Sequence, residues 1–404
     1  MVVFGSTRTI AVRLQGKTGG TQKMFVRPIQ SVNCWLSKKL VSMVAIGAFS
    51  LALGTMGLAR SSPRSPNSRP DGESGRVLGI AFDGHQVSNL EQSIKFYEAL
   101  DFHLSGKPTD WKVDKMVNEL GGTKGAESRT AVLLVQSSVS DKPFPLILRE
   151  YRGVDRKDWS NLSSSDLLSG HMDLTVQDDC NPIMDKLKAM NMLRVPPMNL
   201  PGGNPAPGGP RRFVFVQDPD GWFIELFALP TPAPGAPPAP PKVSNSTATQ
   251  ANIDRLGKQT GFNHIGLNIV DPKKALSLYQ DVLGGDYPPL APSPAAPAAA
   301  GGAPRMNMLN GWFPQATTDG HVRLELIAFP QPPEKQQPPD QHFADINVNY
   351  VGFQVTDLDA VYARAKAVGA ITVSDGIVKM KDGRAVMLRD PDVGGFFELW
   401  EPSK

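Results

Sequence analysis

The stretches HMDLTVQDDCNPIMDKLKAM (residues 171–190) and HIGLNIVDPKKALSLYQDVLG (residues 264–284) decide the fold, because they share one pattern. Each begins with a histidine in a run whose alternate residues are apolar, which is typical of a β-strand with one buried face. Each then passes a turn containing aspartate and enters a segment with apolar residues at helical spacing. They predict two strand–turn–helix units of the same kind.

The same pattern occurs twice more, as IAFDGHQVSNLEQSIKFYEAL (residues 80–100) and YVGFQVTDLDAVYARAKAVGA (residues 350–370). Recurrence at this scale indicates an internal repeat with four copies. In each copy a short polar residue stands where the turn gives way to the helix, the position at which a side chain caps the first free N–H groups. The predicted caps are Asn89, Asp178, Asp271 and Asp357.

Strand-like segments close each repeat. Two of them, residues 213–229 and 385–402, contain Asp-Pro-Asp turns (DPDG and DPDV) between β-rich runs, which predicts hairpins. The other two repeats end in PLILREY (residues 145–151) and RLELIAF (residues 323–329). We therefore expect an α+β protein in which every repeat contributes a helix and antiparallel strands.

The 37 prolines and 38 glycines of the 404-residue chain concentrate in a few stretches, which we interpret as linkers. The predicted organisation follows from them: an N-terminal extension (1–59), a flexible tether (60–76), a first module (77–229), a Pro-rich linker (230–259) and a second module (260–402). A net charge of +3 from 42 basic and 39 acidic residues, without a basic run interleaved with aromatics, argues against nucleic acid as a partner.

Residues 41–59 form an uncharged apolar run that follows Lys38 and Lys39 and ends in Gly-Leu-Ala. This composition predicts a signal peptide and therefore export to the periplasm or the outside of the cell. The run is also long enough to span a bilayer, so an uncleaved membrane anchor is the alternative. A membrane would then be a partner only in the uncleaved form.

The repeated strand "His-apolar-x-apolar" before a turn and helix, together with the closing "Asp-Pro-Asp-Gly-x-x-x-Glu-Leu", resembles the glyoxalase, bleomycin-resistance and extradiol-dioxygenase superfamily, also called the vicinal-oxygen-chelate (VOC) superfamily. The resemblance covers both modules and implies four βαβββ half-modules that form cup-shaped mixed sheets. It implies a fold but no single reaction, because members of one fold carry out different chemistries.

In this family the metal ligands come from the first and last strands of each half-module. Carried onto this sequence, the second and third halves supply His171, Glu225, His264 and Glu325. If these two halves share one cup, as the resemblance to fused glyoxalase-like chains implies, the four residues meet in one site. The first and fourth halves would then form a degenerate second site from Phe82, Ile147, Tyr350 and Glu398. If each module closed on itself instead, the four-ligand site would not exist.

Two imidazoles and two carboxylates suit one divalent ion of Zn, Ni, Co, Mn or Fe, and leave two positions in an octahedral shell for a substrate with adjacent oxygens. The resemblance implies a lyase or isomerase in which the metal polarises a carbonyl and Glu225 or Glu325 removes the adjacent proton. The predicted partner is a small molecule, and a monomer with two fused modules is plausible.

Two other functions stay open at this point. An extradiol-type dioxygenase would need two histidines and one carboxylate around Fe(II), but within the second module Tyr350 stands where the second histidine would be. A non-catalytic small-molecule binding protein of the antibiotic-binding type would need no turnover. Export also counts against glyoxalase I itself, because its thiol cosubstrate is intracellular.

Several polar residues have simpler interpretations. His85 lies three positions after Phe82, so strand alternation sends it to the opposite face, and we assign it no functional role. Asp218 and Asp390 are interpreted as turn-forming residues. For Glu325 an alternative stays open, because RLELIAF could also present this side chain on a solvated face.

Overall fold

The computed structural model describes residues 75–163, 166–167, 169–194, 213–229, 254–290, 307–316, 320–328 and 340–403. The apolar run 41–59, the tether before residue 75 and most of the Pro-rich linker lie outside these residues, so the signal peptide, the anchor and export stay predictions of the sequence. Within the described segments, no helix is both long and apolar enough to cross a membrane.

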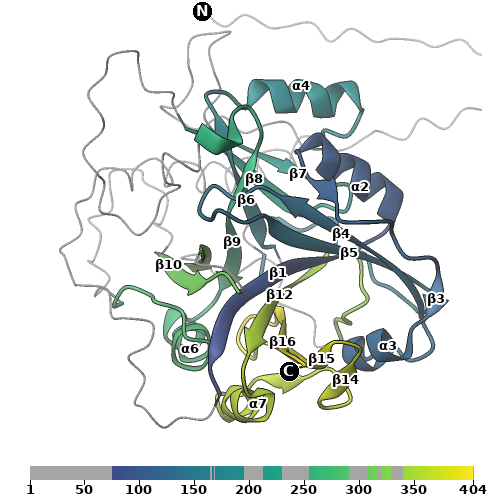
Figure 1. Cartoon of the computed structure of the whole chain (residues 1–404), viewed down its shortest axis with the longest axis vertical. Helices are drawn as coiled ribbons and strands as arrows, with labels where there is room; N and C mark the ends of the chain where they lie inside the picture. Colours follow the sequence, from purple (N-terminus) through teal and green to yellow (C-terminus); the bar gives the residue numbers. More distant parts are fainter. Residues whose placement is uncertain are drawn as a thin grey trace, which may run out of the picture.

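The larger of the two sheets in the described segments has ten strands, in the order β13-β15-β16-β12-β1-β5-β4-β2, with β14 paired to β15 and β3 paired to β4 (Figure 1). Its strands are β1 (Val77–Val87), β2 (His103–Leu104), β3 (Lys112–Val113), β4 (Glu127–Val135), β5 (Phe144–Arg152), β12 (Val348–Val355), β13 (Ile371–Thr372), β14 (Val378–Met380), β15 (Gly383–Arg389) and β16 (Phe396–Pro402).

The smaller sheet has six strands in the order β10-β11-β9-β6-β8-β7. They are β6 (His171–Gln177), β7 (Phe213–Gln217), β8 (Phe223–Leu229), β9 (Gly261–Ile269), β10 (Asn307–Pro314) and β11 (His321–Ala328).

Each sheet is built from one half of each predicted module. The smaller sheet joins the second and third halves through the antiparallel pair β6–β9, and the larger sheet joins the first and fourth halves through the antiparallel pair β1–β12. The predicted α+β architecture with mixed sheets is confirmed. The pairing of halves is the one that the four-ligand site requires, although the module boundaries themselves stay a prediction.

The helices are α2 (Leu90–Ala99), α3 (Lys115–Gly121), α4 (Asn181–Ala189), α6 (Pro272–Leu276), which continues as the π-helical turn η2 (Ser277–Val282), and α7 (Leu358–Ala367). The predicted caps Asn89, Asp271 and Asp357 are confirmed, because each side chain accepts an N–H from the first turn of its helix.

The predicted cap Asp178 is wrong. Helix α4 begins after Cys180, which has no side-chain cap, and the side chain of Asp179 accepts the N–H of Asn181 instead. Asp178 takes a left-handed conformation with φ of 66°, which an aspartate adopts more easily than most residues. The helix of this half-module therefore begins two residues later than its sequence pattern indicated.

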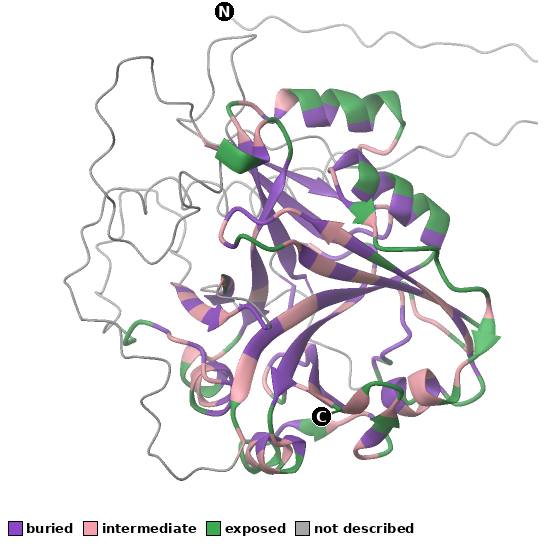
Figure 2. Cartoon of the chain, in the orientation of Figure 1, coloured by how far each residue is buried: buried purple, intermediate pink, exposed green. Residues whose placement is uncertain are grey.

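One apolar core joins both sheets and the helices that cover them, and Figure 2 shows buried strands beneath helices whose outer faces are exposed. Strand β6 shows how the sequence makes this arrangement. Met172, Leu174 and Val176 point into the core, so His171 and Asp173 point to the opposite face of the sheet. We call that opposite face the small-sheet face, and the corresponding face of the ten-stranded sheet the large-sheet face.

Candidate metal site

Strand register brings the four predicted ligands together on the small-sheet face. In the β6–β9 pair, His171 lies opposite Gly266 and Asp173 lies opposite His264. The flanking parallel strands then place Glu225 beside Asp173 and Glu325 beside Gly266. All four predicted residues are buried, and the alternative of a solvated face for Glu325 is wrong, since this residue is only 3% exposed.

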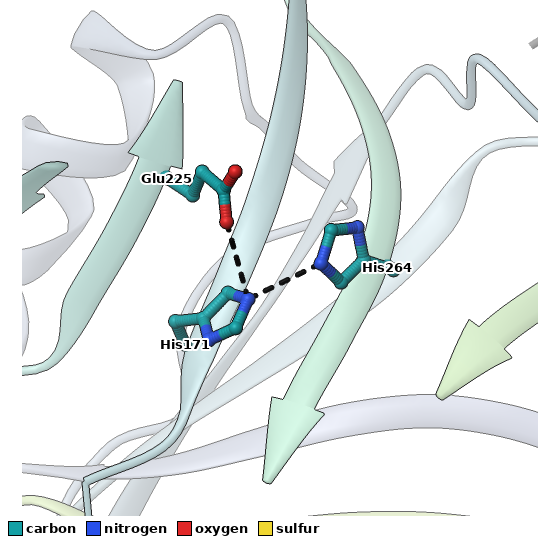
Figure 3. Close-up of side chains that lie close together, drawn as sticks. All are labelled: His171, Glu225 and His264. Atoms are coloured by element: carbon teal, nitrogen blue, oxygen red, sulfur yellow. Dashed lines mark hydrogen bonds and ion pairs between the residues drawn. The ribbon is translucent and has the colours of Figure 1, made fainter. Parts of the chain in front are cut away.

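The side chains converge on one point, as Figure 3 shows for three of them. The Nε2 atom of His171 lies 3.2 Å from Nε2 of His264 and 3.3 Å from a carboxylate oxygen of Glu225. A carboxylate oxygen of Glu325 lies 3.6 Å from Nε2 of His171 and 3.5 Å from Nε2 of His264. His171, Glu225 and His264 therefore form a buried group that could hold a metal ion.

These separations fit a shared ion. Bonds of about 2.1 Å to nitrogen or oxygen put neighbouring ligand atoms about 3.0 Å apart in an octahedral shell and about 3.4 Å apart in a tetrahedral one. The observed distances between the imidazole and carboxylate atoms fall in and just above this range. Imidazole with carboxylate is a donor set suited to first-row divalent metals.

Burial keeps both histidines in the neutral form that binds metal. Desolvation, with the neighbouring His264, lowers the pKa of His171 to about 3. Desolvation and the nearby charge of Arg323 hold the pKa of His264 well below its usual value. Both imidazoles are thus neutral across the physiological range, so a metal need not displace a proton from them.

The carboxyl groups respond in the opposite direction. Burial raises the pKa of Glu225 well above its usual value, with Asp173 and Glu325 adding repulsion between like charges. Burial likewise raises the pKa of Asp173 to about 7. A hydrogen bond joins these two carboxyl groups, so the site holds a proton that a cation can replace.

A polar network fixes the orientation of the His264 ring. Its Nδ1 lies 3.1 Å from Oδ1 of Asn263, whose amide donates to the hydroxyl of Thr175 at 3.1 Å. When Nδ1 donates to that amide oxygen, the lone pair of Nε2 points toward the other ligands. The guanidinium of Arg323 also lies against the ring, with Nη2 in contact with Nδ1 and 3.2 Å from Nε2, so Arg323 is a second possible partner of Nδ1.

Asp173 and Arg323 are functional neighbours to which the sequence analysis gave no role. Strand alternation puts Asp173 on the same face as His171, but the pattern of ligand positions does not predict that this carboxyl group contacts Glu225. Arg323 precedes Glu325 by two positions and so shares its face of β11, a parity signal that was present in RLELIAF.

Glycine lets the histidine ring lie flat across the neighbouring strand. A Cβ built on Gly266 would lie 1.9 Å from Cε1 of His171, and one on Gly352 would lie 2.3 Å from the ring of Phe82. The equivalent position beside Tyr350 is Gly84. The half-module that begins with His171 has Asp173 instead of glycine at this position. The register of the β6–β9 pair shifts directly after Asp173.

The residues of the predicted degenerate site occupy the same positions on the large-sheet face. The rings of Phe82 and Tyr350 meet edge to face at 5.8 Å, as the rings of His171 and His264 do at 5.2 Å. Ile147 and Glu398 take the places of the two glutamates, because they pair with Gly84 and Gly352.

A second buried group, His85 with Asp218 and Asp220, lies on the other face of β1. Nε2 of His85 is 3.1 Å from Asp218, whose carboxylate also accepts the hydroxyl of Tyr97 and the N–H of Trp222. The turn-forming role of Asp218 is thus confirmed, and the alternation argument placed His85 on the correct face. The sequence analysis nevertheless missed their contact, because strand parity does not identify the partner across a core.

This Asp218 group is mainly a structural connection between helix and hairpin. In the other half of the chain the hydroxyl of Tyr279 hydrogen-bonds to Asp390, and Leu267 stands where His85 would be. Both oxygens of Asp218 are occupied by protein donors, so binding a metal here would require these contacts to break.

Paired strand–helix repeats with two histidines and two glutamates on facing central strands define a candidate metalloprotein of mixed α+β fold. Residues 261–395 match the model of the Glyoxalase/Bleomycin resistance protein/Dioxygenase superfamily. No match was found among curated proteins.

Among solved structures, glyoxalase I from Zea mays is 17% identical, covers 81% of this chain and 93% of its own, and has a TM-score of 0.43. The fosfomycin resistance protein FosX from Listeria monocytogenes is 16% identical, covers 35% of this chain and 93% of its own, with a TM-score of 0.22. The trypanothione-dependent glyoxalase I from Leishmania major is 22% identical, covers 36% of this chain and 82% of its own, with a TM-score of 0.23.

Replacing Gly266 by alanine should weaken metal binding by about tenfold or more, because the added methyl group would push the His171 ring away from the other ligands. Gly352→Ala is the matched control, since it crowds Phe82 in the same way on the large-sheet face. Titration of both variants with Zn²⁺, alongside thermal unfolding, checks this. Equal metal affinity in the two variants would contradict the close-approach argument.

Proposed function

We propose that the chain is a divalent-metal-dependent lyase or isomerase that acts on a small molecule with adjacent oxygen atoms. The observation that carries the proposal is the convergence of His171, His264, Glu225 and Glu325 from four strands within 3.2–3.6 Å contacts. Four buried donors of this kind would leave room in an octahedral shell for two substrate oxygens. When bound, the metal would polarise a carbonyl of the substrate.

Within this proposal Glu225 is the base that removes the proton next to that carbonyl. Burial raises the pKa of Glu225, which makes its carboxylate a stronger base than a solvated glutamate. Asp173 is its hydrogen-bonded neighbour and can hold the shared proton. Glu325 contacts both histidines, which favours the role of a permanent ligand.

A dioxygenase is the second candidate, because His171, His264 and Glu225 by themselves have the two-histidine, one-carboxylate composition of Fe(II) oxygenase sites. The two candidates differ in their need for Glu325. A lyase or isomerase of the proposed kind uses it as fourth ligand, whereas an oxygenase needs that position open. Oxygen uptake by the iron-loaded protein with a catechol, unaffected by Glu325→Gln, would favour the dioxygenase.

The purified protein should bind one divalent metal ion per chain. His171→Ala and His264→Ala should each abolish stoichiometric binding, because each removes a donor from the same group. Elemental analysis after reconstitution with Zn, Ni, Co, Mn and Fe measures this. His103→Ala is the control, since that side chain is exposed on β2. Absence of stoichiometric metal after every reconstitution would leave only the third function, a metal-free binding protein.

Metal affinity should rise with pH and level off above about 7. The pKa of Asp173 is raised from 3.8 to about 7, so the folded metal-free protein holds this proton more tightly than the unfolded chain. For this group, folding stability is highest below its unfolded pKa and decreases as pH rises toward 7. A cation must displace the proton, so affinity should gain about tenfold per pH unit below 7 for each proton released.

The histidines do not add to this pH dependence, because the pKa of His171 lies at about 3. Asp173→Asn removes the titrating group and should flatten the profile between pH 5.5 and 7 by roughly one proton. Competition with a chelator of known affinity measures both profiles. A flat profile in the unchanged protein would refute the proposed proton displacement.

The substitutions Glu225→Gln and Glu325→Gln should distinguish the proposed base, Glu225, from the proposed permanent ligand, Glu325. Glu225→Gln should retain metal and lose about 100-fold or more of the proton exchange at the carbon next to a carbonyl, since a missing general base costs about 10²–10⁴. Glu325→Gln should bind metal more weakly than Glu225→Gln, because Glu325 contacts both histidines. Exchange of solvent deuterium into α-hydroxyketones or hemithioacetals, followed by NMR, measures the reaction. If Glu225→Gln keeps full exchange with metal bound, Glu225 is not the base.

A further inference from the structure

The large-sheet face has no histidine at the positions of Phe82 and Tyr350, but it holds a buried cation. Arg149 lies on β5 two residues after Ile147, so both side chains project from the same face of the sheet. The equivalent positions of the other half-modules, two residues after each glutamate, hold Phe227, Ile327 and Trp400. An arginine therefore stands in one half-module where the other three have apolar side chains.

The guanidinium of Arg149 is only partly satisfied by protein. The residue is 9% exposed, and its Nε donates to the hydroxyl of Thr130 at 3.2 Å. Its Nη1 is buried without a hydrogen-bond partner among the described residues, although the hydroxyl of Tyr151 and the carboxyl group of Glu398 lie near enough to raise the pKa of Arg149. Burying a guanidinium whose donors are not all hydrogen-bonded is costly, so an anion at this position would be favourable.

Other polar groups face the same region. The Tyr350 hydroxyl and both amide atoms of Gln86 are buried and have no hydrogen-bond partner among the described side chains. Gln86 pairs with Arg149 across β1 and β5, and the Tyr350 ring covers Gly84 next to them. Arg149, Tyr350 and Glu398 are close enough to influence one another electrostatically.

The acidity of Glu398 fits a role as a donor rather than as a counter-ion. Burial raises the pKa of Glu398 to about 7, although the positive charge of Arg149 opposes the shift. At neutral pH a large fraction of this carboxyl group is therefore protonated and can donate a hydrogen bond. A protonated carboxyl, a phenol and a guanidinium together offer hydrogen-bond donors to an oxygen-rich anion.

Apolar side chains complete the walls of this region. Phe343 packs edge to face on Tyr350 at 5.0 Å and on Phe396 at 5.5 Å. Half-buried Phe82, Trp159 and Trp400 pack against the same cluster. Polar donors converging within apolar walls is the usual composition of a small-molecule site.

We propose that the large-sheet face, around Arg149, Tyr350 and Glu398, is a second ligand site that binds a small carboxylate without metal. Arg149 binds the carboxylate through its planar guanidinium, which matches two oxygens at once. Tyr350 and Glu398 donate to a further oxygen of the ligand. The site that the sequence analysis described as a degenerate twin is on this proposal an anion site, opposite in charge to the acidic small-sheet face.

Titration of the full-length protein with glycolate, followed by calorimetry and ligand-detected NMR, tests the proposal. Binding is expected in His264→Ala, which removes a metal donor, and is expected to be at least about tenfold weaker in Arg149→Lys and in Arg149→Met. Glycolamide, the neutral analogue, should bind much more weakly than glycolate. Tyr350→Phe removes one hydroxyl group and should weaken binding without changing the charge.

Each other outcome overturns the proposal. One is that the unchanged protein fails to bind glycolate, and another is that it binds glycolamide as tightly as glycolate. A third is that binding is lost in His264→Ala but kept in both Arg149 variants. Thermal unfolding monitors whether each variant folds. If Arg149→Met does not fold, Arg149→Lys and Tyr350→Phe decide, and undiminished binding in both refutes the site. These measurements do not require the metal ligands, so their outcome does not decide whether the proposed metal-dependent function is correct.

Discussion

The antiparallel pairing of β6 with β9 is the interaction on which the candidate site depends. It sets two strands from different sequence modules side by side with His171 opposite Gly266 and Asp173 opposite His264. A slip of one residue in this register would turn one histidine toward the apolar core. The parallel neighbours β8 and β11 pair with these strands in a fixed register, which places Glu225 and Glu325 beside the two histidines. One ladder of backbone hydrogen bonds thus fixes four side chains that are far apart in sequence.

The two sheets show how one backbone arrangement supports opposite electrostatics. On the small-sheet face, two neutral imidazoles are surrounded by three acidic groups, and burial makes the ionised forms of Asp173 and Glu225 costly unless a cation compensates. On the large-sheet face, aromatic rings replace the imidazoles, one glutamate becomes Ile147, and Arg149 adds a buried positive charge. The two sheets thus share one strand register. The uncompensated charge is negative on the small-sheet face and positive on the large-sheet face.

Local pattern was sufficient for much of the architecture. Alternation and turn residues identified four strand–helix units and three of four caps, and the resemblance of these units to a known superfamily located Glu225 and Glu325 beside the two histidines. The missed features are contacts across the sheet or the core. Asp173 meets Glu225 through strand register, Arg149 meets Tyr350 across three strands, and His85 meets Asp218 through the core. Parity along one strand fixes the face of a side chain, but only the three-dimensional pairing fixes its neighbour.

Comparison among the four half-modules of this one chain separates structural from functional polar groups. A contact that recurs in both halves of the chain, such as the phenol–carboxylate pairs Tyr97–Asp218 and Tyr279–Asp390, serves the common fold, because both hairpins must be tied to their helices. A residue that differs from its equivalents in the other three copies is not required by the common fold. Asp173 departs where the others have glycine, and it sits against the candidate base. Arg149 departs where the others have apolar residues, and it leaves a buried donor facing the second site. A charge that the fold does not need, and that burial makes costly, is retained more readily where a ligand compensates it.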